Sequence, residues 1–231
     1  MHASPSSGPP PPSATVEDYA KAIYSLTGAR AQTASTNDLA ERLGVTPGSV
    51  SAMARKLADA GLVEHIPYRG VALTPKGEQV ALKVLRRHRL LELFLAEMLE
   101  VPWERVHAEA EILEHALSED LTDLIALKLG DPTVDPHGDP IPSRDLVVDE
   151  RPTDSLADMQ PGRCATLVRV SDSDPEMLSY LTGLGITVGD PLEMVERQPF
   201  DGPCIVRFGE RTHVLGLPLA RAMRVRAQEP A

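Results

Sequence analysis

The feature that most constrains the fold is a pair of closely spaced helix boundaries near the N-terminus. The stretch "STNDLAERLGV" offers Ser35 or Thr36 as an N-cap and Gly44 as a stop, which predicts a short helix over about 37–43. An amphipathic stretch that begins at Thr15 predicts another helix before it. The N-terminal region is therefore expected to begin with two helices.

A third helix and a β-hairpin are expected directly afterwards. In "TPGSVSAMARKLADAGL", Thr46 is the expected N-cap and Pro47 the first helical residue, and the helix should run to Gly61. The next residues, "LVEHIPYRGVALT", predict two short strands around a turn at 68–70. Three helices and a hairpin in succession are the layout of a winged helix-turn-helix, which is predicted for residues 14–76.

The charge of this module differs from that of the whole chain. Residues 14–76 hold seven basic and six acidic residues, whereas the chain has a formal net charge of −11, which argues against broad affinity for nucleic acid. In the third helix small polar residues come first and cations last, which suits approach to the major groove and contact with phosphates. A solvated helix of a bundle would look similar, but the hairpin adds a second contact element. The residues predicted to contact DNA are Thr46, Pro47, Ser49, Ser51, Arg55, Lys56 and Arg69.

Possible metal ligands are concentrated in the stretch "HAEAEILEH", residues 107–115. On a helix of about 100° per residue, four of them share an arc of about 100°, and Glu109 falls on the far side. These four are His107, Glu111, Glu114 and His115. An apolar stripe lies beside the arc and comprises Val106, Ala110, Leu113 and Leu117. Glutamate-rich helix faces are common and mostly inert, so the stretch alone is compatible with a solvated face or with half of a metal site.

Further possible ligands lie on other predicted helices. His88 and Glu92 are four residues apart on a long helix expected from Pro75 to about residue 98, so they share one face. Asp18 belongs to the first helix. Each has a plain alternative, because His88 follows two arginines and an acid in a first turn is favoured by the helix dipole. Spacing alone does not show that these helices converge.

In the second half of the chain, the sequence pattern changes from one typical of helices to one typical of β-strands. Helices are expected around 103–117 and 119–129, and the proline-rich residues 130–160 are expected to be irregular. From Gly162 onward about five short strands are expected, with one helix that ends at Gly185, and these fit a small SH3-like barrel. The predicted fold class is therefore mainly α with a β C-terminal domain.

Bulk properties argue against several classes of protein. No run approaches about 18 apolar residues, so no transmembrane helix is expected. The start "MHASPSSGPPPPSA" lacks the parts of a signal peptide, and Cys164 and Cys204 form no CxxC pair, which predicts a reduced, cytoplasmic protein. A di-metal carboxylate enzyme would need paired Glu-x-x-His motifs, but one such motif is present, at 104–107, and HExxH is absent. The chain is therefore not expected to be an enzyme.

Five consecutive motifs carry a more specific signal. They are "VEDYAKAIYSL", "LAERLGVTPGSVSAMARKLADAGLV", "YRGVALTPKG", "RRHRLLELFL" and "VHAEAEILEHALSEDL". In this order they resemble the diphtheria-toxin-repressor (DtxR/MntR) family of metal-activated transcriptional repressors. The likeness covers nearly the whole chain and includes the connector "HGDPIP" at 137–142 and the C-terminal domain.

The resemblance implies a plan of domains and partners. Residues 1–13 would be a disordered tail and residues 14–76 the winged helix-turn-helix. Residues 77–142 would be a helical dimerisation and metal-binding domain, residues 143–160 a linker, and residues 161–231 an SH3-like (FeoA-like) domain. The expected partners are double-stranded operator DNA and a second copy of the chain, with no membrane.

The resemblance also assigns metal ligands by position. Four residues would form a primary site: Asp18, Glu111, Glu114 and His115. Three more would form an ancillary site with an acceptor from the third domain: His88, Glu92 and His107. Asp172 is the expected acceptor, with Asp174 and Glu176 as alternatives.

The types of ligand favour Mn²⁺ as the activating metal. Iron-responsive members carry Met and Cys at the positions of Asp18 and Glu111, and two carboxylates make a harder set that suits Mn²⁺ better. Lys21 stands where two-domain manganese-type members carry a second Glu, which argues for two more separated sites instead of a bridged metal pair. The alternatives are Fe²⁺ or another divalent transition metal, and a winged-helix regulator that senses an organic ligand and leaves the ligand cluster at 88–115 unused.

Overall fold

A computed structural model describes residues 12–28, 33–66 and 69–227. Most of the predicted N-terminal tail, and Tyr68 of the predicted wing turn, lie outside these described residues. The chain divides into two compact units, and the boundary falls after Arg86, inside one long helix.

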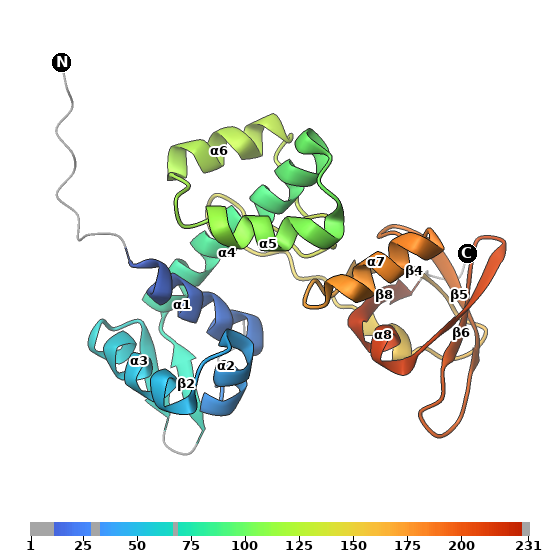
Figure 1. Ribbon diagram of the computed structural model, residues 1–231, viewed down its shortest axis with the longest axis horizontal. Helices are drawn as coiled ribbons and strands as arrows, with labels where there is room; N and C mark the ends of the chain where they lie inside the picture. Colours follow the sequence, from blue (N-terminus) through green and yellow to red (C-terminus); the bar gives the residue numbers. More distant parts are fainter. Residues whose placement is uncertain (1–11, 29–32, 67–68, 228–231) are drawn as a thin grey trace. The chain divides into compact units, whose positions relative to one another are not determined.

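The first unit is a winged helix-turn-helix (Figure 1). Its elements in chain order are α1 (Ala14–Thr27), α2 (Thr36–Leu43), α3 (Pro47–Asp59), β1 (Val63–Ile66), β2 (Gly70–Leu73) and the start of α4 (Pro75–Leu99). β1 and β2 form the predicted antiparallel hairpin. An apolar core that includes Ile23, Leu39, Leu57 and Val71 joins the three helices to this hairpin.

The predicted helix boundaries of this unit are confirmed by their caps. Ser35 Oγ accepts a hydrogen bond from the backbone N–H of Asp38 at 3.1 Å, and Gly44 ends α2 with a φ of 63°. Thr46 Oγ1 accepts from the backbone N–H of Ser49 at 3.2 Å and so caps α3. Because both caps satisfy backbone groups that a helix end leaves open, they set the sharp turn between α2 and α3.

The second unit begins with a helical layer formed by α4, α5 (Trp103–Leu113) and α6 (Glu119–Lys128). Their shared core includes Leu90, Leu91, Ala110 and Ile125. Within the part of the chain that the structure describes, no helix is both long and apolar enough to span a membrane.

α5 ends at Leu113 instead of at residue 117, and this changes which side chains are buried. Val106 and Ala110 are buried as the helical pattern predicts. The chain forms a turn over 114–116, and Leu113, the last residue of α5, is 42% exposed. Glu114, in the turn, is completely buried. The predicted end of this helix near residue 117 is therefore wrong by about four residues, because the turn at 114–116 interrupts the helix.

The C-terminal β domain has an antiparallel, SH3-like sheet, whose strand order among the described residues is β3-β8-β4-β5-β6-β7. The elements are β3 (Asp154–Ser155), η1 (Leu156–Asp158), β4 (Cys164–Val170), α7 (Pro175–Leu184), β5 (Pro191–Arg197), β6 (Cys204–Phe208), β7 (Arg211–Leu215), α8 (Leu217–Ala222) and β8 (Met223–Ala227). Figure 1 shows α7 and α8 packed beside these strands.

Two parts of this domain differ from the sequence prediction. β3 and η1 lie in residues predicted to be a linker, yet Leu156 is completely buried in the core of the β domain. α8 follows β7 directly, in a stretch where only strands were expected. Its Leu217 and Ala220 are buried, so a single short helical turn closes this side of the core.

Gly70 should not tolerate a side chain. It begins β2 with a φ of 109°, and a Cβ atom there would lie 2.0 Å from the carbonyl oxygen of Ala34. Ala34 is bound to the hairpin through backbone hydrogen bonds with Val71, so it cannot move away without breaking them. Gly70→Ala should therefore lower the free energy of unfolding by about 3 kcal/mol.

Gly44→Ala is the matched control, because Gly44 also has a positive φ but has open space around it. It should lower the free energy of unfolding by about 1 kcal/mol. Urea unfolding of the full chain measures both variants, and equal losses would contradict the proposed clash with Ala34.

Candidate metal centre

Four side chains of the second unit converge, and they form what we call the central cluster: His88, Glu92, His107 and Asp172. His88 Nε2 lies 3.0 Å from Glu92 Oε1 and 3.1 Å from His107 Nδ1. His107 Nδ1 also lies 3.1 Å from Glu92 Oε1 and 3.1 Å from Asp172 Oδ2. The structure thus brings together the residues that the sequence predicts for the ancillary site.

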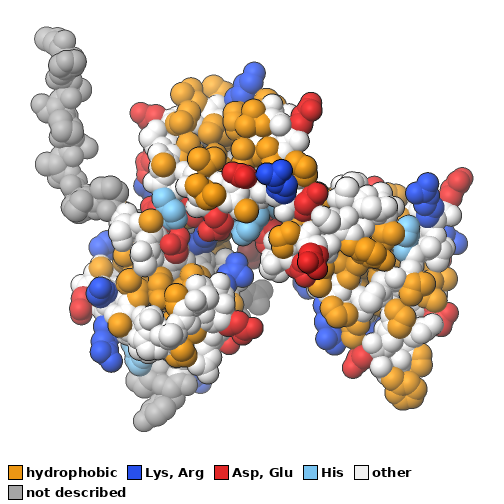
Figure 2. Space-filling model, viewed as in Figure 1, with side chains coloured by type: hydrophobic (Ala, Val, Ile, Leu, Met, Phe, Trp, Pro, Cys, Tyr) orange, Lys and Arg blue, Asp and Glu red, His pale blue; other side chains and the backbone are white. Residues whose placement is uncertain are grey.

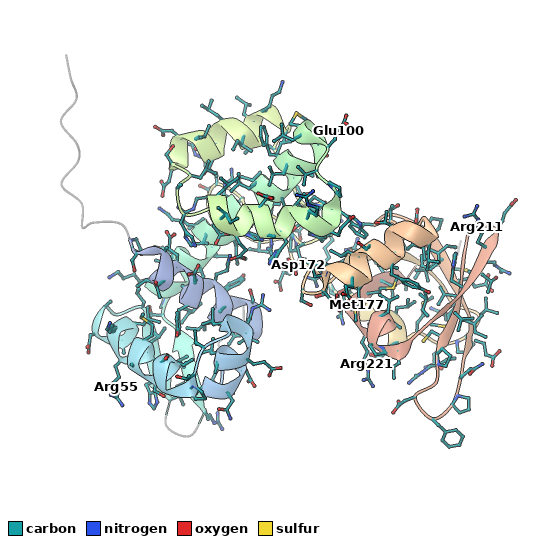
Figure 3. The ribbon with its side chains drawn as sticks, viewed as in Figure 1. Arg55, Glu100, Asp172, Met177, Arg211 and Arg221 are labelled. Carbon is teal, nitrogen blue, oxygen red and sulfur yellow. The ribbon has the colours of Figure 1, made fainter. Side chains whose placement is uncertain are left out.

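These side chains come from three elements of the second unit. α4 carries His88 and Glu92 one turn apart, α5 carries His107, and Asp172 lies in the loop between β4 and α7 (Figure 3). His88 is 4% exposed and Glu92 is completely buried. Because removing a carboxylate from water costs several kcal/mol unless positive charge or hydrogen bonds match it, this cluster is no solvated charged face. The alternative interpretation of His88 as part of a solvated basic patch is therefore excluded.

Hydrogen bonding within the chain does not account for the convergence of these atoms. His107 Nδ1 has three close neighbours, each at 3.1 Å: His88 Nε2, Glu92 Oε1 and Asp172 Oδ2. A ring nitrogen carries at most one hydrogen, and carboxylate oxygens only accept. One proton can therefore serve one of these contacts well, whereas a cation at their centre would attract all four ligand atoms.

The spacing and chemistry of the cluster fit a divalent transition metal. At a metal–ligand length of about 2.1 Å, two ligands at right angles lie about 3.0 Å apart. The four separations given above are 3.0 or 3.1 Å. Imidazole nitrogens with carboxylate oxygens are donors that manganese, iron and zinc all accept.

The charges of the cluster are strongly coupled. Hydrogen bonds to Asp172 and Glu92 raise the pKa of His107 to about 10, although burial opposes this. Burial raises the pKa of Glu92 and of Asp172, but their contacts with the histidines outweigh it, and both pKa values lie below their ordinary range. In the metal-free chain, a proton on His107 thus supplies positive charge between two carboxylates.

The second nitrogen of His88 faces a different group of residues, which we call the outer cluster: Glu111, Glu114 and His115. His88 Nδ1 lies 2.5 Å from Glu114 Oε2 and 3.7 Å from Glu111 Oε1. Glu114 Oε1 lies 3.5 Å from His115 Nε2. The outer cluster contains the predicted primary-site residues of the second unit, and His88 contacts both clusters. Asp18, the fourth predicted residue, lies on α1 in the first unit, so its place in this set stays a prediction.

The structure adds two candidate ligands that sequence reasoning missed, Asp135 and His137. His137 Nε2 donates a hydrogen bond to the Trp103 carbonyl oxygen at 2.8 Å, so its Nδ1 carries a lone pair when the ring is neutral. This Nδ1 faces Glu92 Oε2 at 3.9 Å, and neither atom has a hydrogen-bond partner among the described residues. Two buried acceptors that face each other need a positive charge or a donor between them.

Asp135 completes this second side of Glu92. It is 5% exposed, and burial, followed by the nearby charges of Glu92 and Asp139, holds its pKa well above the ordinary range. Asp135, His137 and Glu92 each offer a ligand atom within 4.8 Å of the others. The signal in the sequence was Asp135 two residues before His137, the first residue of "HGDPIP", but that stretch was interpreted only as a connector.

The alternatives to Asp172 have other roles in the structure. Asp174 caps α7, because its Oδ1 accepts from the backbone N–H groups of Glu176 at 2.9 Å and Met177 at 3.3 Å. Glu176 is exposed. Of the three predicted acceptors, Asp172 is thus the one that contacts His107.

The residues predicted to contact DNA are all exposed on the first unit: Thr46, Pro47, Ser49, Ser51, Arg55, Lys56 and Arg69. Arg55 projects from the outer side of α3 (Figure 3). All three hydroxyls of this set are engaged within the chain, since Thr46 Oγ1 lies 2.9 Å from Ser49 Oγ and Ser51 donates to the Pro47 carbonyl at 3.0 Å. The exposed cations are therefore the strongest candidates for contact with phosphate.

Three family models match the chain in succession. The model described as "Iron dependent repressor, N-terminal DNA binding domain" matches residues 13–71. The model of the "metal binding and dimerisation domain" of the same repressors matches residues 74–143. The FeoA domain model matches residues 155–227, which include β3 and η1.

Individual relatives and a solved structure are also similar to this chain. The chain is 32% identical over 228 residues to the iron-dependent repressor IdeR of Mycobacterium tuberculosis, a match that covers 91% of this chain and 96% of IdeR. It is 41% identical over 115 residues to the regulator MntR of Lysinibacillus sphaericus, covering 50% of this chain and 81% of that protein. A solved structure of a manganese-dependent transcriptional repressor in complex with manganese is 42% identical, with a TM-score of 0.87 over 92% of this chain and 100% of that one.

A winged helix-turn-helix combined with buried imidazole and carboxylate ligands defines a metal-responsive DNA-binding protein. The chain belongs to the diphtheria-toxin-repressor (DtxR/MntR) family and is a metal-dependent transcriptional repressor. The family resemblance predicted from the sequence motifs is thus confirmed. Members of this family regulate transcription with a divalent metal, through the DNA-binding and dimerisation domains that this chain carries.

The affinity for Mn²⁺ should rise with pH. The raised pKa of His107, about 10, means that the ring is protonated at neutral pH in the metal-free chain. A metal needs the unprotonated nitrogen, so binding should release this proton, and the apparent affinity should rise about tenfold per pH unit between about pH 6.5 and 8.5. Competition with a chelating indicator measures this.

His107→Gln is the control for this prediction and should show a weaker dependence on pH. The stability of the metal-free chain should change with pH in the opposite direction from the metal affinity: the contribution of His107 to stability should fall as the pH rises. A histidine whose folded pKa is raised stabilises the fold fully below its ordinary pKa of 6.5, and this contribution is lost as the pH rises through about 10. An affinity that does not change with pH would contradict the proposed protonation of His107.

Proposed function

We propose that this chain is an Mn²⁺-activated repressor that binds double-stranded operator DNA as a homodimer in the cytoplasm and controls metal-ion homeostasis. The observation that carries the proposal is the convergence of two histidines and two carboxylates at 3.0–3.1 Å. The same chain carries a winged helix-turn-helix with exposed cations on α3. Binding of metal and reading of DNA are therefore both supported by specific residues.

The types of ligand support Mn²⁺ over Fe²⁺. The predicted primary site has carboxylates at Asp18 and Glu111, where iron-responsive members of the family carry Met and Cys, and hard oxygen donors suit Mn²⁺. Cys164 and Cys204 lie on β4 and β6, outside both clusters. The similar manganese-bound repressor agrees with this choice, whereas the similarity to IdeR keeps Fe²⁺ as the alternative.

We assign the ligands to two sites. The central cluster would be the ancillary site, with Asp135 and His137 as further candidate ligands on the other side of Glu92. The outer cluster, together with Asp18, would be the primary site. A divalent cation, when bound, would supply the positive charge that these closely spaced carboxylates require.

Activation would depend on the division of the primary ligands between the two units. Asp18 belongs to the unit that reads DNA, and the outer cluster belongs to the other unit. In the metal-free chain, repulsion between these carboxylates would disfavour bringing the ligands of the two units together. When the ligands share a cation, one orientation is favoured, so metal shifts a population between two states.

Exposed apolar side chains on α5 and α6 support a homodimer. Large hydrophobic residues on these helices are strongly exposed: Ile112 at 73%, Leu113 at 42%, Leu121 at 47%, Leu124 at 61% and Leu127 at 68%. Figure 2 shows hydrophobic side chains gathered over this part of the second unit. A second copy that covers this surface would present two α3 helices to successive major grooves, about 34 Å apart.

A mobility-shift titration tests the proposed function. Addition of Mn²⁺ should raise the affinity of the chain for its operator at least tenfold. Glu92→Gln should move the midpoint to a higher concentration of Mn²⁺, because it weakens the central cluster. Arg55→Ala is the matched control and should lower DNA affinity at every Mn²⁺ concentration without moving that midpoint. Operator affinity that is unchanged by Mn²⁺ would show that the mechanism is wrong.

Asp18→Met tests the origin of metal selectivity. A softer thioether in place of a carboxylate should shift the preference for activation from Mn²⁺ toward Fe²⁺ by about tenfold. The measurement is operator binding under anaerobic conditions with each metal in turn. If the ratio of the two activation midpoints does not change, the hardness of this ligand does not set selectivity.

A further inference from the structure

The connector between the helical layer and the β domain is attached closely to strand β4. The backbone N–H of Val170 donates a hydrogen bond to the His137 carbonyl oxygen at 2.9 Å. Gly138 has a φ of 87°, and a Cβ atom there would lie 2.0 Å from the carbonyl oxygen of Val168, so the backbones approach as closely as glycine allows. β4 ends two residues before Asp172. The position of the connector therefore affects the position of Asp172.

A charged bridge crosses this connector from α4 to β4. Asp139 Oδ1 accepts hydrogen bonds from Arg169 Nη1 at 3.1 Å and from Arg89 Nη2 at 3.3 Å. Arg89 Nη1 also donates to the Pro140 carbonyl oxygen at 2.5 Å. The side chains of Arg89, Asp139 and Arg169 are 15%, 19% and 32% exposed. Charge-assisted hydrogen bonds in partly buried positions hold geometry better than exposed ion pairs do.

The two arginines lie next to ligands of the central cluster in the sequence. Arg89 follows His88 on α4, and Arg169 lies three residues before Asp172 near the end of β4. The bridge through Asp139 therefore links the helix that carries two ligands to the strand that leads to another. A separate contact holds α5 to α7, where Trp103 Nε1 donates to Thr182 Oγ1 at 2.7 Å.

We propose that Arg89, Asp139 and Arg169 are positioning residues that place Asp172 against His107 for metal binding. The inference rests on the proposed function of the central cluster. None of the three touches the metal in this account, because their charged groups are engaged with one another and, in the case of Arg89, also with Asp135 at 3.8 Å. Loss of the bridge leaves the contact between α5 and α7 and the pairing of β4 with β8 in place. It removes the side-chain link between α4 and β4, so Asp172 is held less firmly against His107.

The test compares Mn²⁺ affinity in full-length variants by competition with a chelating indicator. Arg169→Gln should weaken Mn²⁺ binding about tenfold, and Asp139→Asn should do the same from the centre of the bridge. Arg169→Lys, which keeps a cation near Asp139, should lose less than Arg169→Gln. Arg163→Gln, at an exposed position just before β4, is the control and should leave affinity unchanged.

A double variant separates positioning from general damage to the fold. In an Asp172→Ala background, Arg169→Gln should weaken Mn²⁺ binding less than twofold further, because the residue that it positions is already absent. A full tenfold loss in that background, or no loss in the wild-type background, would overturn the inference. Equal affinity of Asp172→Ala and wild type would also overturn it, while leaving a metal site on the other ligands. Absence of Mn²⁺ binding by the wild-type chain would instead refute the proposed function, and the inference with it.

Discussion

The arrangement of the second unit depends on the buried carboxylate of Glu92. Its side chain is excluded from water, with Oε1 3.0–3.1 Å from two imidazole nitrogens and Oε2 3.9 Å from a third. Burial raises the pKa of Glu92, yet hydrogen bonds with His107 and His88 outweigh it, so the carboxylate stays charged. A buried charge without matching partners is strongly destabilising. The elements that carry those partners must therefore meet at α4: α5, the connector and the loop after β4.

If the central cluster binds the metal, as proposed, a proton and a divalent metal compete for the same ligands. In the metal-free chain the proton on His107 supplies the positive charge between Glu92 and Asp172. A metal in that position requires the ring to be neutral. His88 extends this competition to the outer cluster, because one ring nitrogen faces Glu92 and the other faces Glu114. In the proposed account, metal responsiveness rests on ligands of the second unit that already lie close together in the metal-free chain.

The comparison of sequence with structure shows which features are local. Thr46 and Gly44 mark helix boundaries by themselves, and the spacing of His88 and Glu92 puts both on one helix face, so these features were predictable. Three other features depend on packing against distant residues: the end of α5 at Leu113, the short helix α8 and the burial of Leu156. Local sequence patterns do not encode this packing. The same holds for the site. Asp135 and His137 reach Glu92 across more than 40 residues of sequence, and even Asp172 was found through family resemblance and not through spacing.

The central claim is that the central cluster, on α4, α5 and the loop after β4, is a metal site. A crystal structure of the full chain grown with Mn²⁺, with anomalous scattering recorded at the manganese edge, tests it most directly. The account predicts a peak enclosed by His88 Nε2, Glu92 Oε1, His107 Nδ1 and Asp172 Oδ2, at about 2.1 Å from each. Manganese peaks elsewhere in the chain, with these four side chains still hydrogen-bonded to one another around an empty centre, would contradict it.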